Sequence, residues 1–158
     1  MIGSRGWIGI ISDTHGLLRP VAVEALRGAE LIVHAGDVGG GGSILRDLEE
    51  IAPLTVVRGN VDAAPWAREL PRTAAVSWGD ELLYVLHDLE ELDLDPKVSG
   101  FSAVISGHSH RPRIQKHDGV LFINPGSAGP RRLRLPVTLA RLRLESYGLQ
   151  AEIVPLDE

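Results

Sequence analysis

Short apolar segments that end at a polar residue of the metal-ligand type recur five times along this chain. Each segment reads as a buried strand, and a ligand-type residue follows each one: Asp13, Asp37, Asn60, His87 and His108. In open α/β sheets, ligands bind beyond the carboxyl ends of the strands. The pattern therefore predicts a sheet-based α/β fold in which five strand ends deliver their side chains to one edge.

The first half of the chain alternates apolar runs with helix-like stretches. We expect strands over 7–12, 31–34 and 54–57, and helices over 20–27 and 43–51. Pro20 suits the first turn of the first helix, and Ser43 is a candidate N-cap of the second. Strand–helix alternation of this kind favours a parallel sheet covered by helices.

The second half is richer in strands. They are expected over 74–78, 82–86, 101–105, 113–116, 120–123, 136–144 and 149–154. Asp118-Gly119 is a strong hairpin signal, and residues 89–99 are expected to form a loop with a short helix. Together the two halves predict two sheets packed face to face with helices outside.

Length and composition indicate one domain over residues 1–158, with residues 1–6 as a candidate flexible leader. The chain has no cysteine, which excludes disulfides and thiolate metal sites and fits a cytoplasmic location. The apolar run from Trp7 to Ile11 is too short to span a membrane, so no membrane partner is expected. The oligomeric state is not specified by the sequence.

The formal net charge is −5, and no basic stripe of the kind that binds nucleic acid is visible. In the sequence the basic residues gather only at Arg131, Arg132 and Arg134, with Arg111 and Arg113 some way before them. Nucleic acid is therefore an unfavoured partner. Bound divalent metals would nevertheless give an acidic protein a cationic pocket for a small phosphate ester.

Four motifs and one lone histidine supply the ligand-type side chains. They are Asp13-Thr14-His15, Gly36-Asp37, Gly59-Asn60, Gly107-His108-Ser109-His110, and His87. Alone, most have another reading: the aspartates and the asparagine suit turns or caps, and a single strand-end histidine is usually only hydrogen-bonded. Together they offer seven oxygen and nitrogen donors, which suits two neighbouring divalent metals that share one carboxylate. Phosphate ester hydrolysis is the chemistry most often built on such a pair.

Other polar residues receive structural readings. We expect His34, inside the second strand, to be structural, and His117, beside a hairpin turn, to be exposed. Asp62 reads either as a helix cap or as support for the ligands. The turn-like segment 124–127 is open to two roles, cradling an anion or hydrogen-bonding a ligand histidine.

In this order, the motifs from Asp13 to about Arg132 resemble the calcineurin-like metallophosphoesterase superfamily. The resemblance is to its small bacterial and archaeal phosphodiesterase branch, which is similar to the retromer subunit Vps29. It implies a two-sheet αββα sandwich of the metallo-dependent phosphatase type. It also implies two divalent metal ions, with manganese expected and nickel, cobalt, iron and zinc as alternatives.

The resemblance assigns roles residue by residue. The first metal would be bound by Asp13, His15 and His110; the second by Asn60, His87 and His108; Asp37 would bridge them. The implied function is a metal-dependent phosphodiesterase that attacks a small phosphodiester with a hydroxide bridging the metals, and Asp37, Asn60 and His108 would carry the catalysis. The alternative is a Vps29-like protein-interaction scaffold with little or no catalysis.

Two positions depart from the wider superfamily. Many members carry a histidine after the Gly-Asn motif that protonates the leaving group, whereas this chain has Val61. Asp88 follows His87, where branch members often have glycine. A carboxylate there would tighten metal binding, act as an acid or base, or repel a doubly charged monoester, and the last role favours diesters.

Overall fold

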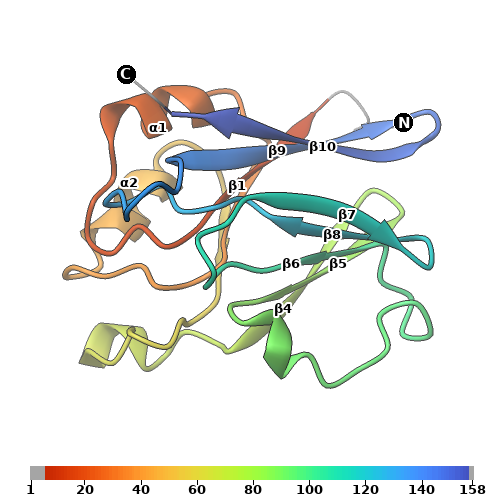
Figure 1. The fold of residues 1–158 in the computed structure, drawn as a ribbon, viewed down its shortest axis with the longest axis horizontal. Coiled ribbons are helices and arrows are strands. Elements are labelled where there is room, and N and C mark those ends of the chain that lie inside the picture. Colours follow the sequence, from red (N-terminus) through yellow and green to blue (C-terminus); the bar gives the residue numbers. More distant parts are fainter. Residues whose placement is uncertain (1–5, 157–158) are drawn as a thin grey trace.

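The computed structural model describes residues 6–156, which form two five-stranded sheets packed face to face (Figure 1). The first sheet has the order β10-β9-β1-β2-β3, with strands Gly148–Pro155, Thr138–Glu145, Trp7–Ile11, Leu31–His34 and Leu54–Val56. The second has the order β4-β5-β6-β8-β7, with strands Thr73–Trp78, Glu81–Leu86, Ala103–Ile105, Val120–Asn124 and Arg113–His117. The expected leader lies outside the described residues except for Gly6.

Strands β1, β2 and β3 are parallel, as the strand–helix alternation predicted, and helices α1 (Pro20–Leu26) and α2 (Ser43–Glu49) connect them. Pro20 opens α1 because its fixed φ suits the first helical turn. The predicted N-cap at Ser43 is wrong. Ser43 is the first helical residue, and Gly42 precedes it with a left-handed φ of 87°, a conformation that glycine adopts without steric cost.

The main core lies between the sheets because side chains alternate along each strand. Ile8 and Ile10 of β1 point inward and pack with Val85 of β5 and Ile105 of β6. These four side chains are fully buried, so the two sheets are joined by a continuous apolar layer. The sheets hold the strand ends in fixed relative positions, which any site at those ends requires.

The outer faces of the two sheets are covered differently. Both α-helices pack on the first sheet, where Ile11, Leu26 and Leu48 share a second buried cluster. On the second sheet the cover comes from the segment between β5 and β6, which contains only the 3-10 turn η2 (Leu89–Glu91). The predicted two-sheet α/β sandwich is confirmed, and its second helical layer is reduced to this single turn.

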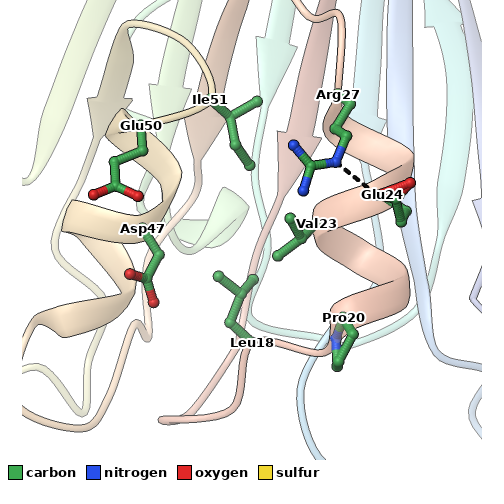
Figure 2. A pocket seen from close by; sticks show the side chains of 8 residues that line it. All are labelled: Leu18, Pro20, Val23, Glu24, Arg27, Asp47, Glu50 and Ile51. Atoms are coloured by element: carbon green, nitrogen blue, oxygen red, sulfur yellow. Dashed lines mark hydrogen bonds and ion pairs between the residues drawn. The ribbon is translucent and has the colours of Figure 1, made fainter.

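The two helices leave a groove of ≈ 530 Å³ between them (Figure 2). Leu18, Val23 and Ile51 point into it, and acidic side chains of both helices stand at its edge. The ion pair between Arg27 and Glu24 spans 2.6 Å, but both side chains are largely exposed, so it adds little to stability. Among the described residues, no helix has the length and apolar character needed to cross a membrane.

Candidate metal centre

The first group of donors joins loops from both sheets. Asp13 and His15 follow β1, and His110 follows β6. Asp13 Oδ1 lies 3.3 Å from His110 Nε2 and 3.7 Å from His15 Nε2, and the two Nε2 atoms are 3.4 Å apart. The three residues each offer a donor atom within 4.8 Å of the others, which is a spacing that one metal ion can span.

The second group collects Asp37, His87 and His108, which follow three different strands, β2, β5 and β6. Asp37 Oδ2 lies 3.2 Å from His87 Nε2. Asn60 joins this group through its amide oxygen, which lies 2.9 Å from His87 Nε2 and 3.2 Å from His108 Nδ1. A neutral oxygen and two imidazole nitrogens therefore converge beside one carboxylate.

Asp37 stands between the two groups. Its Oδ2 is 3.2 Å from His87 Nε2 in the second group and 3.7 Å from His15 Nε2 in the first. Asp13 Oδ1 in turn lies 3.9 Å from His87 Nε2, so the groups adjoin. The structure thus brings together all seven residues that the sequence predicted as donors, and Asp37 lies within 4 Å of a histidine of each group.

An unpaired carboxylate oxygen indicates what the donors fit. Within residues 6–156, Asp13 Oδ1 is buried and makes no contact with hydrogen-bond geometry, although three imidazole Nε2 atoms lie within 4 Å of it. A buried anionic oxygen that accepts no hydrogen bond carries a desolvation cost, which the imidazoles at these distances offset only in part. Oxygen and nitrogen donors without sulfur suit divalent transition metals. The donor set therefore fits cations held at this position.

The electrostatics of the metal-free site keep both aspartates ionised. Burial raises the pKa of Asp13, but His110, His15 and the Ser12 hydroxyl outweigh it and hold that pKa well below its usual range. Burial likewise opposes ionisation of Asp37, yet His87 and the amide of Val61 lower its pKa. For His87, burial is outweighed by Asp37 and Asp13, which raise its pKa to about 8. A proton on His87 thus partly balances the carboxylates that a metal would neutralise.

The backbone of the site is strained. Five of the seven residues adopt a positive φ: Asp13 (56°), His15 (46°), Asp37 (56°), His108 (73°) and His110 (64°). Non-glycine residues in this region cost on the order of 1–3 kcal/mol each, and such strain gathers at functional sites. The left-handed turns redirect the chain just beyond each strand, which brings side chains from both sheets to one point.

Hydrogen bonds to two aspartates lock the loops together. Asp13 Oδ2 accepts from Ser12 Oγ at 2.6 Å and from the His108 amide at 3.1 Å, which joins the loops after β1 and β6. Asp62 accepts from the amides of Val38, Gly39 and Gly59 at 3.2, 3.2 and 2.9 Å, which joins the loops after β2 and β3. Asp62 therefore supports the ligand loops and does not cap a helix.

The segment 124–127 also holds backbone. Asn124 Nδ2 donates to the Gly107 carbonyl at 3.0 Å and to Ser109 Oγ at 3.1 Å, and Ser127 Oγ donates to the Asp13 carbonyl at 2.9 Å. These contacts fix the course of two ligand-bearing loops. Of the two roles considered for this segment, a hydrogen bond to a ligand histidine ring is not what the described contacts show.

His34 is structural, as expected, because both ring nitrogens are used inside the core. Nδ1 accepts from the Gly36 amide at 3.1 Å, so Nε2 carries the proton and donates to Thr14 Oγ1 at 3.0 Å. Thr14 Oγ1 then donates to the Val38 carbonyl at 2.8 Å. These hydrogen bonds connect the segment Asp13-Thr14-His15 to the loop that carries Asp37. The sequence did not indicate the supporting roles of Ser12 and Thr14. Ser12 is marked only as the polar residue directly after an apolar strand, and Thr14 only by its place between Asp13 and His15.

The buried His34 predicts a pH dependence of stability. Burial lowers the pKa of His34 from 6.5 to about 4, so between these values the proton binds the unfolded chain preferentially. The free energy of unfolding of the metal-free protein should therefore fall as the pH drops from 6.5 to 4, by about 3 kcal/mol at most from this group. Urea unfolding at several pH values measures this.

The matched variant is His34→Gln, whose amide keeps one donor and one acceptor but does not titrate in this range. The difference in unfolding free energy between wild type and variant isolates the His34 contribution from that of the other ionisable groups. A difference that stays constant from pH 7 to pH 4 would show that His34 is not held neutral by burial.

Comparison with known proteins identifies relatives over nearly the whole chain. Residues 7–147 match the model of the calcineurin-like phosphoesterase superfamily domain. A probable metallophosphoesterase of Methanothermobacter thermautotrophicus is 36% identical over 159 residues, covering 93% of this chain and 91% of that protein. A second probable metallophosphoesterase, from Methanocaldococcus jannaschii, is 34% identical over 172 residues, covering 100% of this chain and 85% of that protein.

Solved structures agree in fold. A structure described as a novel archaeal phosphodiesterase superposes with a TM-score of 0.77 at 25% identity, covering 94% of this chain and 99% of that one. Vps29 of Entamoeba histolytica in complex with zinc superposes with a TM-score of 0.71 at 20% identity, covering 96% and 99% of the chains. The second likeness concerns the fold alone.

Proposed function

We propose, from the premise that this chain belongs to the calcineurin-like phosphoesterase superfamily, that it hydrolyses small phosphodiesters with two bound divalent metal ions. The single observation that carries the proposal is the convergence of seven oxygen and nitrogen donors into two adjoining groups with Asp37 between them. Membership of the family implies a hydrolase acting on phosphate esters. The preference for diesters and the pair of metals are the proposed refinements.

Each group of donors would hold one ion. Asp13, His15 and His110 form the first site, Asn60, His87 and His108 the second, and Asp37 contributes to both. Bound divalent ions supply Lewis acidity toward the phosphoryl oxygens and a hydroxide nucleophile near neutral pH. Manganese is our first choice, and the donor set suits nickel, cobalt, iron and zinc as well.

The protein's own residues set the ligand orientation. The His87 ring contacts the Ala35 carbonyl through Nδ1 at 2.7 Å, which leaves Nε2 directed at Asp37 and Asn60. His108 uses Nδ1 toward Asn60, and its side chain is 46% exposed. This exposed ring marks the side from which a substrate can approach.

The residue at position 61 cannot protonate the leaving group. Val61 is half exposed beside Asn60, and its side chain has no proton to give. A good leaving group such as an aryl oxide departs without being protonated, whereas an alkyl oxide needs a general acid. We therefore expect aryl diesters to be hydrolysed faster than alkyl diesters.

Asp88 supports the preference for diesters. Its Oδ2 lies 3.8 Å from His108 Nε2, and its side chain is 28% exposed. A carboxylate at this entrance repels a dianionic monoester more than a monoanionic diester. Two charges about 4 Å apart in water interact by about 1 kcal/mol, so Asp88→Asn should raise the monoester rate relative to the diester rate by about fivefold. Parallel kcat/KM measurements on both esters check this.

The direct test of the function uses metal-reconstituted protein. Bis(p-nitrophenyl) phosphate should be hydrolysed faster than p-nitrophenyl phosphate, and His108→Ala should abolish both activities. A protein that binds its metals but hydrolyses neither ester would contradict the proposal. It would then favour the alternative, a protein-interaction scaffold on the same fold, which has no need of seven converging donors.

A further inference from the structure

A hollow of ≈ 350 Å³ opens beside the second group of donors. Asn60 and His87 line one part of it, and three arginines line another: Arg58, Arg68 and Arg72. All three come from one stretch of chain, which runs from β3 past the 3-10 turn η1 (Pro65–Ala67) to β4. The fold thus places three arginine residues around a hollow that also borders Asn60 and His87 of the candidate metal centre.

Among the described residues, the side chains of these three arginines have no partner. In the chain from Gly6 to Leu156, no side-chain hydrogen bond or ion pair involves Arg58, Arg68 or Arg72. Some other arginines are paired, whereas the exposed side chain of Arg46 in α2 has no partner in the described part of the chain either, so what distinguishes the three is that they line one hollow. Arg143 binds Glu152 at 2.7 Å, and Arg19 donates to the Gly129 carbonyl at 3.2 Å. Unpaired like charges around one hollow repel one another, and a bound anion would relieve that repulsion.

Three carboxylates also line the hollow, but two of them are turned elsewhere. Asp62 accepts three backbone amides of the ligand loops. Asp88 accepts from the Glu90 amide, and its Oδ2 faces His108 Nε2. Glu91, an exposed residue of η2, is the remaining acid. Guanidinium donors therefore outnumber the carboxylate oxygens that are free to meet them.

A second, larger hollow of ≈ 960 Å³ lies on the His108 side and has a different chemistry. Apolar side chains, including Phe122 and Leu135, form much of its lining. Asp88 lines both hollows, so they meet beside the metal centre. A phosphodiester carries two substituents on phosphorus, and this arrangement offers a separate place for each.

We propose that Arg58, Arg68 and Arg72 bind a second phosphate group, carried by one substituent of the substrate. This inference rests on the proposed phosphodiesterase function and narrows its substrate class to diesters that bear an additional phosphate monoester. The guanidinium fork matches the oxygens of a phosphate with paired, charge-assisted hydrogen bonds. The neighbouring divalent ions would strengthen the field that attracts such a substituent.

The test compares two nucleotides that differ only in the added phosphate. Calorimetry on manganese-loaded protein would measure the Kd of thymidine 3′,5′-bisphosphate and of thymidine 5′-monophosphate. We expect the bisphosphate to bind about tenfold more tightly, because the charge-assisted hydrogen bonds to its added phosphate should increase the affinity by about this factor. Arg58→Ala, Arg68→Ala and Arg72→Ala should each reduce the ratio, and the triple variant should bring it to about one.

A matched control and a kinetic arm separate this inference from the proposed function. Arg46→Ala removes an exposed arginine of α2 that lines neither hollow, and it should leave the ratio unchanged. Hydrolysis of thymidine 5′-(p-nitrophenyl phosphate), with and without a 3′-phosphate, reports the same preference in KM.

Equal affinity for the two nucleotides, or a preference that survives in the triple variant, would overturn the inference even if the plain ester is hydrolysed. A preference that disappears with the arginines, in a protein that hydrolyses neither ester, would support the arginine site and overturn the phosphodiesterase function.

Discussion

An Asp37→Ala protein is expected to lose about 10³-fold or more in kcat/KM toward an aryl diester, because the carboxylate proposed to be shared by the two metals is removed. Asp37 Oδ2 lies 3.2 Å from His87 Nε2 and 3.7 Å from His15 Nε2, so no neighbour can replace it. Lewis-acid stabilisation by metals contributes several kcal/mol, which corresponds to about this factor in rate. Steady-state kinetics measures the loss of activity, and metal analysis of the dialysed protein measures the accompanying loss of bound metal.

Asp37→Asn is the matched control for this prediction. Asparagine tolerates the φ of 56° and still offers an oxygen to the Val61 amide, which now contacts Asp37 Oδ1 at 3.0 Å. It should retain the thermal stability of the wild type while binding metal more weakly, because the shared negative charge is gone. A variant with normal metal content and full activity would show that Asp37 is not shared between two ions.

Gly59→Ala is expected to damage the site without replacing any donor residue. A Cβ at position 59 would overlap Asp37 Oδ1 and the Asp37 backbone nitrogen and would lie 2.8 Å from Asp37 Cγ. Backbone cannot move aside as a flexible side chain can, so the loops after β2 and β3 must separate. We expect a loss of about 1–3 kcal/mol in unfolding free energy from overpacking. A ligand shift of about 1 Å should lower activity by about 100-fold.

Gly41→Ala is the control glycine variant, since a Cβ there meets nothing within 4 Å and its φ is not in the left-handed region. It should match the wild type in urea unfolding and in kcat/KM. If Gly59→Ala behaves like Gly41→Ala in both measurements, the close approach of the two loops is not what positions Asp37.

The strand ends were predictable because continuous apolar runs, and their order along the chain, can be read from the sequence. Asp13, Asp37, Asn60, His87 and His108 each follow an apolar run, and parallel strands bring such residues to one edge. Pairing between distant strands was not predictable in the same way. Strand β9 joins the first sheet beside β1, some 130 residues apart in the chain, through contacts that no local pattern specifies.

The parts of the site that escaped prediction depend on backbone conformation and on packing across loops. The sequence names the donors, but the positive φ at His108 and His110 is set by contacts of their loops, such as Asn124 with Gly107. The arginine hollow escaped for a similar reason. Arg58, Arg68 and Arg72 are spread over fifteen residues, and only the turn between β3 and β4 brings them together. The basic residues that cluster in the sequence lie elsewhere.

The most direct test of the account is anomalous diffraction from crystals of the protein grown with Mn²⁺. We expect two anomalous peaks in each molecule, one among Asp13, His15 and His110 and the other among Asn60, His87 and His108, with Asp37 contacting both. A single peak, or peaks away from these side chains in protein that is fully loaded by metal analysis, would contradict the two-metal centre and the function inferred from it.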